Sequence, residues 1–364
     1  WKNQAKKAYK RLQQIDVKPK TNLPKLEVNF ADGPYVCLRD AKQEYNIDFY
    51  NQDLNKIEYS TKLKNNHWGK TYHKFFINWD IQVKDNFVEF QKKHKCHVTV
   101  STFWNKFFKN KYPELNFVEP GETVPNIYAM YELGWFYEGD TDKLDGFKQP
   151  YDPKQYTLQQ TATNILGLEY KEIIPRMDYQ VKDRPWKEKY ICISPHASAG
   201  TKYWQHEEGW QTVINYINNV LGYKVVMISK EKYKDSGETD KLPLKKKFKN
   251  IIDKTGNLPI EEIINLLHHS EMYIGVSSGL AWLSWAIENP VVLISGFSAE
   301  WTEFTTNVQR IINKDVCNSC FNNFKLDAGD WNWCPIHKDT PRQFECTKKI
   351  LPESVIEGIT RSLS

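Results

Sequence analysis

The stretch YICISPHASAGTK, residues 190–202, indicates the fold of this 364-residue chain most clearly. Its first five residues predict a strand, since four of them form an apolar run of the kind found in strands that are covered on both faces of a sheet. The loop that follows contains Ser198, Gly200 and Lys202. Small residues let backbone N–H groups approach an anion, and the lysine adds a positive charge. The loop therefore predicts a diphosphate site, with an ordinary strand-to-helix connection as the alternative.

The same alternation of strand and helix continues as far as residue 294. Further apolar runs predict strands at 224–228, 272–276 and 290–294. The segments between them predict helices at 209–221, 260–268 and 280–287. Buried strands that alternate with helices are the pattern of a doubly wound sheet with helices on both faces. The predicted fold class of this part is therefore α/β, and the chain shows no repeat of solenoid period.

Two more strand ends carry polar residues that suit a phosphate. Lys230 and Glu231 follow the strand at 224–228, although a surface ion pair is the more probable origin of such a pair on spacing alone. Ser277, Ser278 and Gly279 lead into an apolar helix, whose exposed N–H groups and dipole favour an anion. Ligands of such sheets bind at the carboxyl ends of the strands, so we expect one shared crevice. The absence of a GxGxxG fingerprint disfavours a nicotinamide cofactor.

The N-terminal half has a different pattern. Residues 1–25 predict a short basic helix, and alternating runs between 28 and 83 predict an antiparallel β module with strands at 45–50, 57–61 and 75–83. A strand–helix–strand order follows, which indicates a parallel sheet. Its elements are a helix at 87–95, a strand at 97–101, a helix at 103–111 and a strand at 115–118. A helix at 157–166 and a linker up to residue 183 complete this half.

Composition limits the possible functions. With 40% hydrophobic and 26% charged residues, the chain is globular rather than disordered. A net charge of +5 fits an anionic small ligand and does not require nucleic acid. The N-terminus lacks the apolar core of a signal peptide, and no apolar run is long enough to cross a membrane. We therefore expect a cytoplasmic protein, and we expect most of its 13 tryptophans to lie in the core.

The strongest single motif is a cysteine knuckle between residues 317 and 346. Cys317 and Cys320 form a CxxC pair, and Cys334 and Cys346 follow within about 30 residues. Four thiolates at this spacing predict a tetrahedral site for zinc or iron, with four free thiols as the alternative. The knuckle is distant in sequence from the predicted phosphate loops, so its role is expected to be structural. We expect His337 to be a surface residue rather than a fifth ligand.

Several of these segments resemble known enzymes. ISPHASAG (193–200) followed by KYW (202–204), together with GVSSGLAW (275–282), resembles the two phosphate loops of heptosyltransferases. VVLISGFS (291–298), DWNWCP (330–335) and RQFECTK (342–348) resemble the narrower family of bacterial autotransporter O-heptosyltransferases. The resemblance extends from about residue 33 to the C-terminus and is densest after residue 189.

The resemblance implies a GT-B enzyme with two Rossmann-like domains and a cleft between them. Residues 1–84 would form the helix and β module, residues 85–183 the acceptor-side domain, and residues 184–364 the nucleotide-sugar domain with the knuckle. It further implies ADP-heptose as donor and a serine hydroxyl of an autotransporter adhesin as acceptor before export. Iron would occupy the knuckle, with zinc as the alternative, and the subunits would form a homo-oligomer such as a ring-like dodecamer.

Individual roles also follow from the resemblance. Ser198 and Lys202 would hold the diphosphate, Lys230 would neutralise the leaving ADP, and Glu231 would lie near the ribose. The remaining donor contacts would come from the loop at 256–258 beside the adenine, with Leu258, and from the phosphate cap Ser277, Ser278 and Gly279. The implied chemistry is an inverting displacement, which needs a general base on the acceptor hydroxyl.

The chain departs from the family pattern at residues 84–87. The family carries a strand and a Gly-Asp-Thr type loop before the helix that we predict to begin at Phe87, and the Asp of that loop is the expected base. About 20–30 residues, enough for a strand, the loop and a helix start, are absent from this sequence. Asp85 is the nearby carboxylate, and we do not assign it as the base. An intact mass of 43.0 kDa would show that the segment is missing from the protein.

Two alternatives to the transferase remain. An inactive homologue that binds the nucleotide sugar could serve as an adhesin chaperone or scaffold, and turnover alone would separate it from the enzyme. A nucleic-acid-binding knuckle protein would bind DNA or RNA in a salt-dependent way. The nearly balanced charge and the predicted diphosphate loops disfavour this second alternative.

Overall fold

The computed structural model of the chain describes residues 28–29, 35–39, 78–120, 122–124, 127–132, 155–230, 248–323 and 333–364. The chain divides into two compact units, Trp1–Asp178 and Tyr179–Ser364. Some predicted features lie outside the described residues, namely the helix at 1–25, the strands at 45–50 and 57–61, and Glu231.

The second unit is built on a sheet of six parallel strands among its described residues. Their order in space is β12-β11-β10-β7-β8-β9. The strands are β7 (Tyr190–Ser194), β8 (Lys224–Ser229), β9 (Ile252–Thr255), β10 (Tyr273–Val276), β11 (Val291–Ile294) and β12 (Val308–Ile311). The chain adds strands outward from β7 in one direction and from β10 in the other, which is the Rossmann order. The predicted α/β class is confirmed for this unit.

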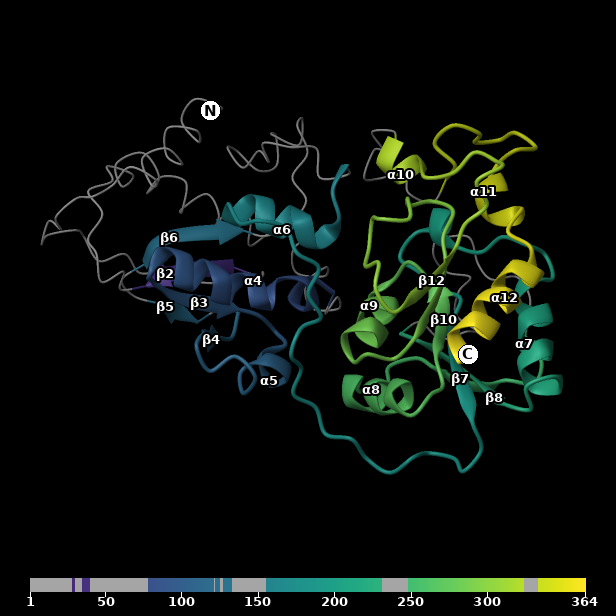
Figure 1. Cartoon of the computed structure of the whole chain (residues 1–364), viewed down its shortest axis with the longest axis horizontal. Coiled ribbons are helices and arrows are strands. Elements are labelled where there is room, and N and C mark those ends of the chain that lie inside the picture. The colour runs from purple at the N-terminus through teal and green to yellow at the C-terminus, as the bar shows by residue number, and fades with distance from the viewer. Residues whose placement is uncertain are drawn as a thin grey trace, which may run out of the picture. The chain divides into compact units, whose positions relative to one another are not determined.

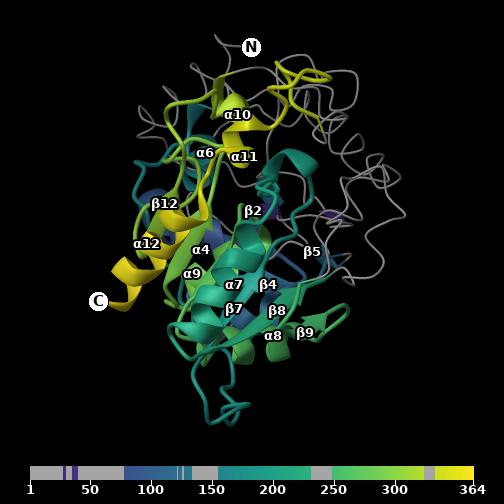
Figure 2. The same ribbon diagram turned by 90° about the vertical axis from the view of Figure 1, so that its right-hand side faces the viewer.

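Helices cover both faces of this sheet (Figure 1). On one face α7 (Gly209–Asn219) and α12 (Pro352–Leu363) lie side by side (Figure 2). On the other face lie α8 (Ile260–His268) and α9 (Gly279–Ala286). α7 buries Trp210, Val213 and Ile217, a spacing that places apolar residues on one side of a helix. Among the described residues, no helix has both the length and the apolar character needed to cross a membrane.

Large aromatic side chains fill part of the core, as expected. Trp282 and Trp285 of α9 are almost fully buried and pack with Phe304, with ring centroids 5.0–5.6 Å apart. α9 is buried on several sides, which explains why its sequence is apolar throughout. The edge strands β9 and β12, in contrast, are only partly buried and lack a continuous apolar run, so the sequence analysis does not identify them.

The first unit contains a four-stranded mixed sheet of order β4-β3-β2-β6. The strands are β2 (Tyr35–Arg39), β3 (His97–Ser101), β4 (Asn116–Val118) and β6 (Ile127–Glu132), and a separate pair joins β1 (Val28–Asn29) to β5 (Thr123–Val124). β3 and β4 are parallel as predicted, whereas β2 is antiparallel to both of its neighbours. Because β2 lies before residue 84 and β3 after it, one sheet crosses the predicted domain boundary.

α4 (Asn78–His94) corrects two predictions. The strand predicted at 75–83 is wrong from Asn78 onward, because that segment is the first part of a helix. Short alternating runs do not separate strand from helix, and no Gly or Pro interrupts the chain between 78 and 94. The helix also begins well before Phe87, so the predicted gap at 84–87 falls inside a continuous helix.

Two shorter helices complete the described part of this unit. The predicted helix at 157–166 is confirmed as α6 (Leu158–Leu166). Thr157 caps its N-terminus by accepting a hydrogen bond from the Gln160 N–H at 2.9 Å, and Gly167 ends the helix with φ 64°. α5 (Asn105–Phe108) is much shorter than the helix predicted at 103–111. Residues 179–183, predicted as linker, belong to the second unit, where the Lys182 N–H donates to Asn265 Oδ1 at 2.8 Å.

Gly275 in β10 is required by a neighbouring side chain. Tyr273 lies on the same face two residues earlier, and a Cβ at position 275 would lie 2.5 Å from the ring carbon that bears the hydroxyl. Tyr273 is fully buried, so its ring has no free space into which to move. We expect Gly275→Ala to lower the free energy of unfolding by about 1–3 kcal/mol. Denaturant melts of this variant and of Gly275→Ala/Tyr273→Leu test the cause, because the double variant should recover part of the loss.

Candidate functional site

The centre of the six-stranded sheet is the place where a ligand is expected. β7 and β10 are parallel neighbours, and the chain continues from them toward opposite edges of the sheet. At such a point the loops that leave the two strands diverge and open a crevice at the carboxyl edge. The loops after β7 and β10 are two of the three predicted phosphate loops.

The predicted contact residues of these two loops are partly exposed within buried surroundings. Ser198 and Lys202 are partly exposed, whereas Ala199, Gly200 and Thr201 beside them are buried. Lys202 ends a short 3-10 helix, Gly200–Lys202. Ser277, Ser278 and Gly279 are also partly exposed, at the start of α9. Both loops therefore pack against the sheet and leave the predicted anion-binding residues accessible.

The other predicted contacts follow β8 and β9 at the same edge of the sheet. Lys230 comes directly after β8 and is exposed. Gly256 follows β9 with φ 109°, a conformation that suits glycine, and its N–H donates to the Ser229 carbonyl at 2.8 Å. The next residues of this loop include Leu258, which is partly exposed. Parallel strands place all these loops at one edge, but their individual roles stay predictions.

Glu303 is a buried residue of this region that the sequence analysis does not identify. It is 4% exposed and lies between β11 and β12. Its carboxylate accepts hydrogen bonds from the hydroxyl groups of Ser277 and of Ser298, the latter at 3.1 Å. Arg310 of β12 donates to it at 2.7 Å. A single glutamate in a connecting segment gives no signal in the linear sequence, because its partners come from separate loops.

Lys202 shares the electrostatic environment of Glu303. Burial lowers the pKa of Lys202, and the Glu303 carboxylate opposes this shift. Burial alone would raise the pKa of Glu303, but Arg310, the Ser277 hydrogen bond and Lys202 together hold it below its usual value. At neutral pH Glu303 is therefore a carboxylate that interacts with two cationic side chains.

The four cysteines of the predicted knuckle form no disulfide, and Cys320 lies close enough to the other three to interact with them electrostatically. Cys320 begins α10 (Cys320–Asn323), Cys346 lies in α11 (Glu345–Lys348), and the His337 N–H donates to the Cys334 sulfur at 3.3 Å. Burial raises the pKa of Cys346 to about 12, with further contributions from Cys334 and Cys317. Burial and the other three thiols also raise the pKa of Cys320. Buried thiols of this kind become good ligands once a soft metal cation stabilises the thiolates.

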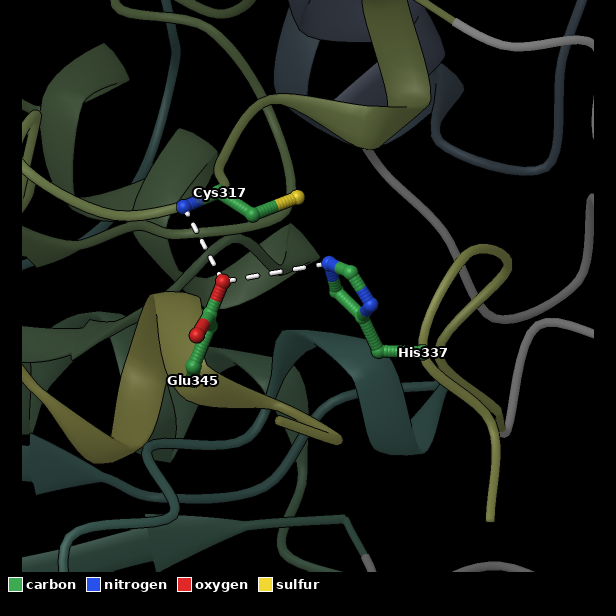
Figure 3. A group of neighbouring side chains, drawn as sticks. All are labelled: Cys317, His337 and Glu345. Atoms are coloured by element: carbon green, nitrogen blue, oxygen red, sulfur yellow. Dashed lines mark hydrogen bonds and ion pairs between the residues drawn. The ribbon is translucent and has the colours of Figure 1, made fainter. Parts of the chain in front are cut away.

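His337 is not the surface residue that the sequence predicts. Its side chain is only 15% exposed, and a ring nitrogen lies 3.8 Å from the Glu345 carboxylate. Cys317, His337 and Glu345 offer ligand atoms that all lie within 4.8 Å of one another, and Glu345 also accepts a hydrogen bond from the Cys317 backbone N–H at 3.2 Å (Figure 3). The donor set thus fits a metal ion, while a shared site of four sulfurs stays a prediction.

The knuckle packs on the segment that follows β11. The Ser319 N–H donates to the Gly296 carbonyl at 2.8 Å, and a Cβ at position 296 would lie 2.8 Å from the Cys346 carbonyl oxygen. Asn322 Oδ1 accepts from the Ala299 N–H at 2.8 Å and from the Thr302 hydroxyl at 3.0 Å. Although distant in sequence from the phosphate loops, the knuckle therefore contacts the segment that carries Glu303.

Asp85 belongs to a separate cluster in the first unit. Its carboxylate accepts from the Tyr112 hydroxyl at 2.7 Å and lies 3.7 Å from the Arg176 guanidinium. Burial raises the pKa of Asp85, and its two partners oppose the shift. Arg176 also donates its backbone N–H to the Tyr112 oxygen at 2.9 Å. These contacts tie α4 to neighbouring segments, which supports a structural role and agrees with leaving Asp85 out of the catalytic assignment.

The fold is that of an α/β protein with a doubly wound sheet, a class in which ligands bind at the carboxyl ends of the central strands. Residues 144–325 match the family described as glycosyltransferase family 9 (heptosyltransferase), and the chain belongs to this family. It is a glycosyltransferase of the heptosyltransferase type.

Three relatives are informative. The autotransporter heptosyltransferase Aah of Escherichia coli is 36% identical over 281 residues, covering 76% of this chain and 68% of Aah. The inactive autotransporter heptosyltransferase BimC of Burkholderia thailandensis is 31% identical, covering 74% and 62%. The crystal structure of the iron-containing dodecameric glycosyltransferase TibC from enterotoxigenic E. coli has a TM-score of 0.69, with 32% identity and coverage of 79% and 73%. The complex of TibC with ADP-D-beta-D-heptose has a TM-score of 0.67, with 34% identity and coverage of 79% and 74%.

Proposed function

We propose that this chain is a protein O-heptosyltransferase. It transfers heptose from ADP-heptose to serine hydroxyls of an autotransporter adhesin passenger, with inversion at the anomeric carbon, in the cytoplasm before export. Family membership and the likeness to TibC, which has been crystallised with ADP-heptose, support the donor. The names of the relatives support an autotransporter as acceptor.

The proposal is carried by the position of the two partly exposed loops after β7 and β10, at the centre of the sheet. In an inverting displacement, negative charge develops on the departing diphosphate, and groups that face this charge lower the barrier. Lys202, the N–H groups at the start of α9 and the dipole of that helix supply such stabilisation. Lys230 after β8 adds a second cation at the same edge of the sheet.

The described residues include no carboxylate that we assign as the general base. Asp85 is engaged by Tyr112 and Arg176, and the family loop that would carry the base is missing from the sequence. One alternative follows from this departure and from the inactive relative BimC. In that alternative the chain binds the nucleotide sugar without turnover and acts as an adhesin chaperone or scaffold.

The metal and the assembly are also part of the proposal. Cys317, Cys320, Cys334 and Cys346 would hold iron, as the iron-containing TibC does, or zinc. When bound, the ion would cross-link segments that are short and rich in turns, and it would take no part in sugar transfer. The dodecameric state of TibC supports a homo-oligomer of this chain.

The direct test is the mass of a serine-rich autotransporter passenger fragment after incubation with this protein and ADP-heptose. Mass gains in steps of one heptose establish the transferase, and conversion of the labelled serines by β-elimination identifies the hydroxyl linkage. Metal-loaded, folded protein that binds ADP-heptose without modifying the fragment would support the inactive alternative.

Lys202 provides a residue-level prediction for donor binding. We expect Lys202→Ala to weaken ADP binding by about tenfold or more, since it removes a charge-assisted contact to phosphate worth about 1.5–3 kcal/mol. Lys224→Ala is the matched control, because Lys224 begins β8 at the opposite edge of the same sheet and pairs with Glu188 at 2.9 Å. Isothermal titration with ADP measures both. Equal affinities for the two variants would contradict the placement of the diphosphate.

A further inference from the structure

Glu303 connects three loops at the carboxyl edge of the second unit's sheet. It accepts hydrogen bonds from Ser277, after β10, and from Ser298, after β11. It also interacts electrostatically with Lys202, after β7. These loops are far apart along the chain, so their relative placement depends on non-covalent contacts of this kind. A buried carboxylate that three of them share is therefore suited to fix the geometry of whatever binds there.

The direction of the Ser277 hydrogen bond limits what this residue can do. An ionised carboxylate only accepts hydrogen bonds, so the Ser277 hydroxyl proton points at Glu303. That hydroxyl then has no proton left to donate to a phosphate oxygen. The groups of this loop that remain to face an anion are the backbone N–H groups at the start of α9. From the hydrogen bond to Glu303 we therefore infer that the Ser277 side chain holds the loop in place.

Arg310 forms a buried ion pair with the Glu303 carboxylate. Its Nη1 donates to Glu303 at 2.7 Å, and the two side chains are 7% and 4% exposed. The Nε and Nη2 atoms of Arg310 are buried without a hydrogen-bond partner. Within the part of the chain that the structure describes, Glu303 is therefore the contact that compensates this buried guanidinium. A pair held this firmly keeps the carboxylate charged and immobile.

We propose that Glu303 is a positioning residue of the donor site: its carboxylate orients the Ser277 loop through a hydrogen bond and supplies a negative charge that acts on Lys202, while Arg310 holds the carboxylate in place. The inference rests on the proposed function, because it takes the diphosphate of a nucleotide sugar as the ligand of these loops. Glu303 itself makes no contact with the ligand.

The expected effect follows from the charges that face one another in this cluster, Lys202 of the β7 loop, Glu303 of the β11–β12 segment and Arg310 of β12. Burial favours the neutral form of Lys202, and the Glu303 charge opposes it. If the carboxylate is neutralised, Lys202 loses its proton at a lower pH. Because the protonated lysine binds phosphate, ADP affinity should then be lost at a lower pH than in the wild-type protein.

The test is ADP binding by the full-length, metal-loaded chain carrying Glu303→Gln, measured by titration calorimetry from neutral to alkaline pH. We expect the alkaline loss of affinity to move to lower pH, with binding above the transition weaker by about tenfold for each pH unit of the shift. Glu300→Gln is the matched control, since Glu300 is an exposed carboxylate three residues away that pairs with Lys314. In a Lys202→Arg background the shift should disappear, because arginine stays charged throughout this range.

The outcomes separate this inference from the proposed function. Wild-type protein that fails to bind ADP contradicts the proposed function and, with it, the ligand assumed here. Wild-type protein that binds ADP, beside a folded Glu303→Gln variant with the same affinity and the same pH profile, overturns the role of Glu303 alone. If Glu303→Gln does not fold, Glu303→Gln/Arg310→Met removes both buried charges, and the same shift is required of it.

Discussion

Replacing Cys317 and Cys320 by serine is expected to release the metal and to unfold or disassemble the protein. Two of the four predicted ligands are lost, and the alcohol side chains that replace them bind zinc or iron poorly. A structural metal contributes about 10–16 kcal/mol in small zinc domains, whereas a whole domain is stable by about 5–15 kcal/mol. The knuckle also packs against the segment after β11, so its loss removes the Asn322 contacts to Ala299 and Thr302.

Metal analysis, size-exclusion chromatography and thermal melts measure this prediction. Cys96→Ala is the control, because Cys96 is a buried thiol of the first unit and its loss should leave the metal content unchanged. A double serine variant that stays folded, assembled and fully active would refute the structural role of the knuckle.

Replacing Arg310 by methionine is expected to lower the free energy of unfolding by about 3–5 kcal/mol, because it leaves Glu303 buried without its guanidinium partner. The stability that the Glu303 carboxylate contributes depends on pH, and the direction follows from its pKa. The pKa of Glu303 in the folded protein lies below its usual 4.5, so the folded protein holds this carboxylate more readily in its charged form than the unfolded chain does. Its contribution to stability is present above that pH and is lost as the pH falls through the folded pKa.

Denaturant titrations at neutral and acidic pH test this second prediction. Arg310→Met should lose most at neutral pH and approach the wild-type stability as the medium becomes acidic. Glu303→Gln/Arg310→Met serves as the control, since it contains neither charge and should recover much of the loss. A single Arg310→Met variant with wild-type stability at neutral pH would show that the ion pair contributes little.

The helices and strands that are most fully buried are the ones that the sequence predicts best. β7 and α8 have the predicted boundaries, because β7 is an apolar run buried on both faces and α8 follows Pro259 with a clear apolar periodicity. β9 and β12 lie at the edges of the sheet, where partial exposure removes that signal. The segment from Asn78 was predicted as a strand because a short alternating run also fits the beginning of a helix.

The residues of the candidate site also differ in whether a local sequence pattern predicts them. The loops at 194–202 and 275–279, and the spacing of the four cysteines, are local patterns, so candidates such as Ser198, Lys202 and Gly279 can be proposed without a structure. The contacts of Glu303 are not local, since Ser277 reaches it from the loop after β10 and Arg310 from β12. The position of His337 beside Glu345 likewise depends on how the knuckle folds.

The amino-acid sequence by itself determined the α/β class of the second unit, the small, polar loops after its strands and the cysteine motif, because periodicity, turn chemistry and residue type act over a few neighbouring positions. The strand order, the antiparallel placement of β2, the buried Glu303–Arg310 pair and the docking of the knuckle were decided only by the tertiary structure. Each of these features brings together residues that are remote in the chain, and the free energy that holds them comes from burial and charge pairing, which exist only after the chain has folded.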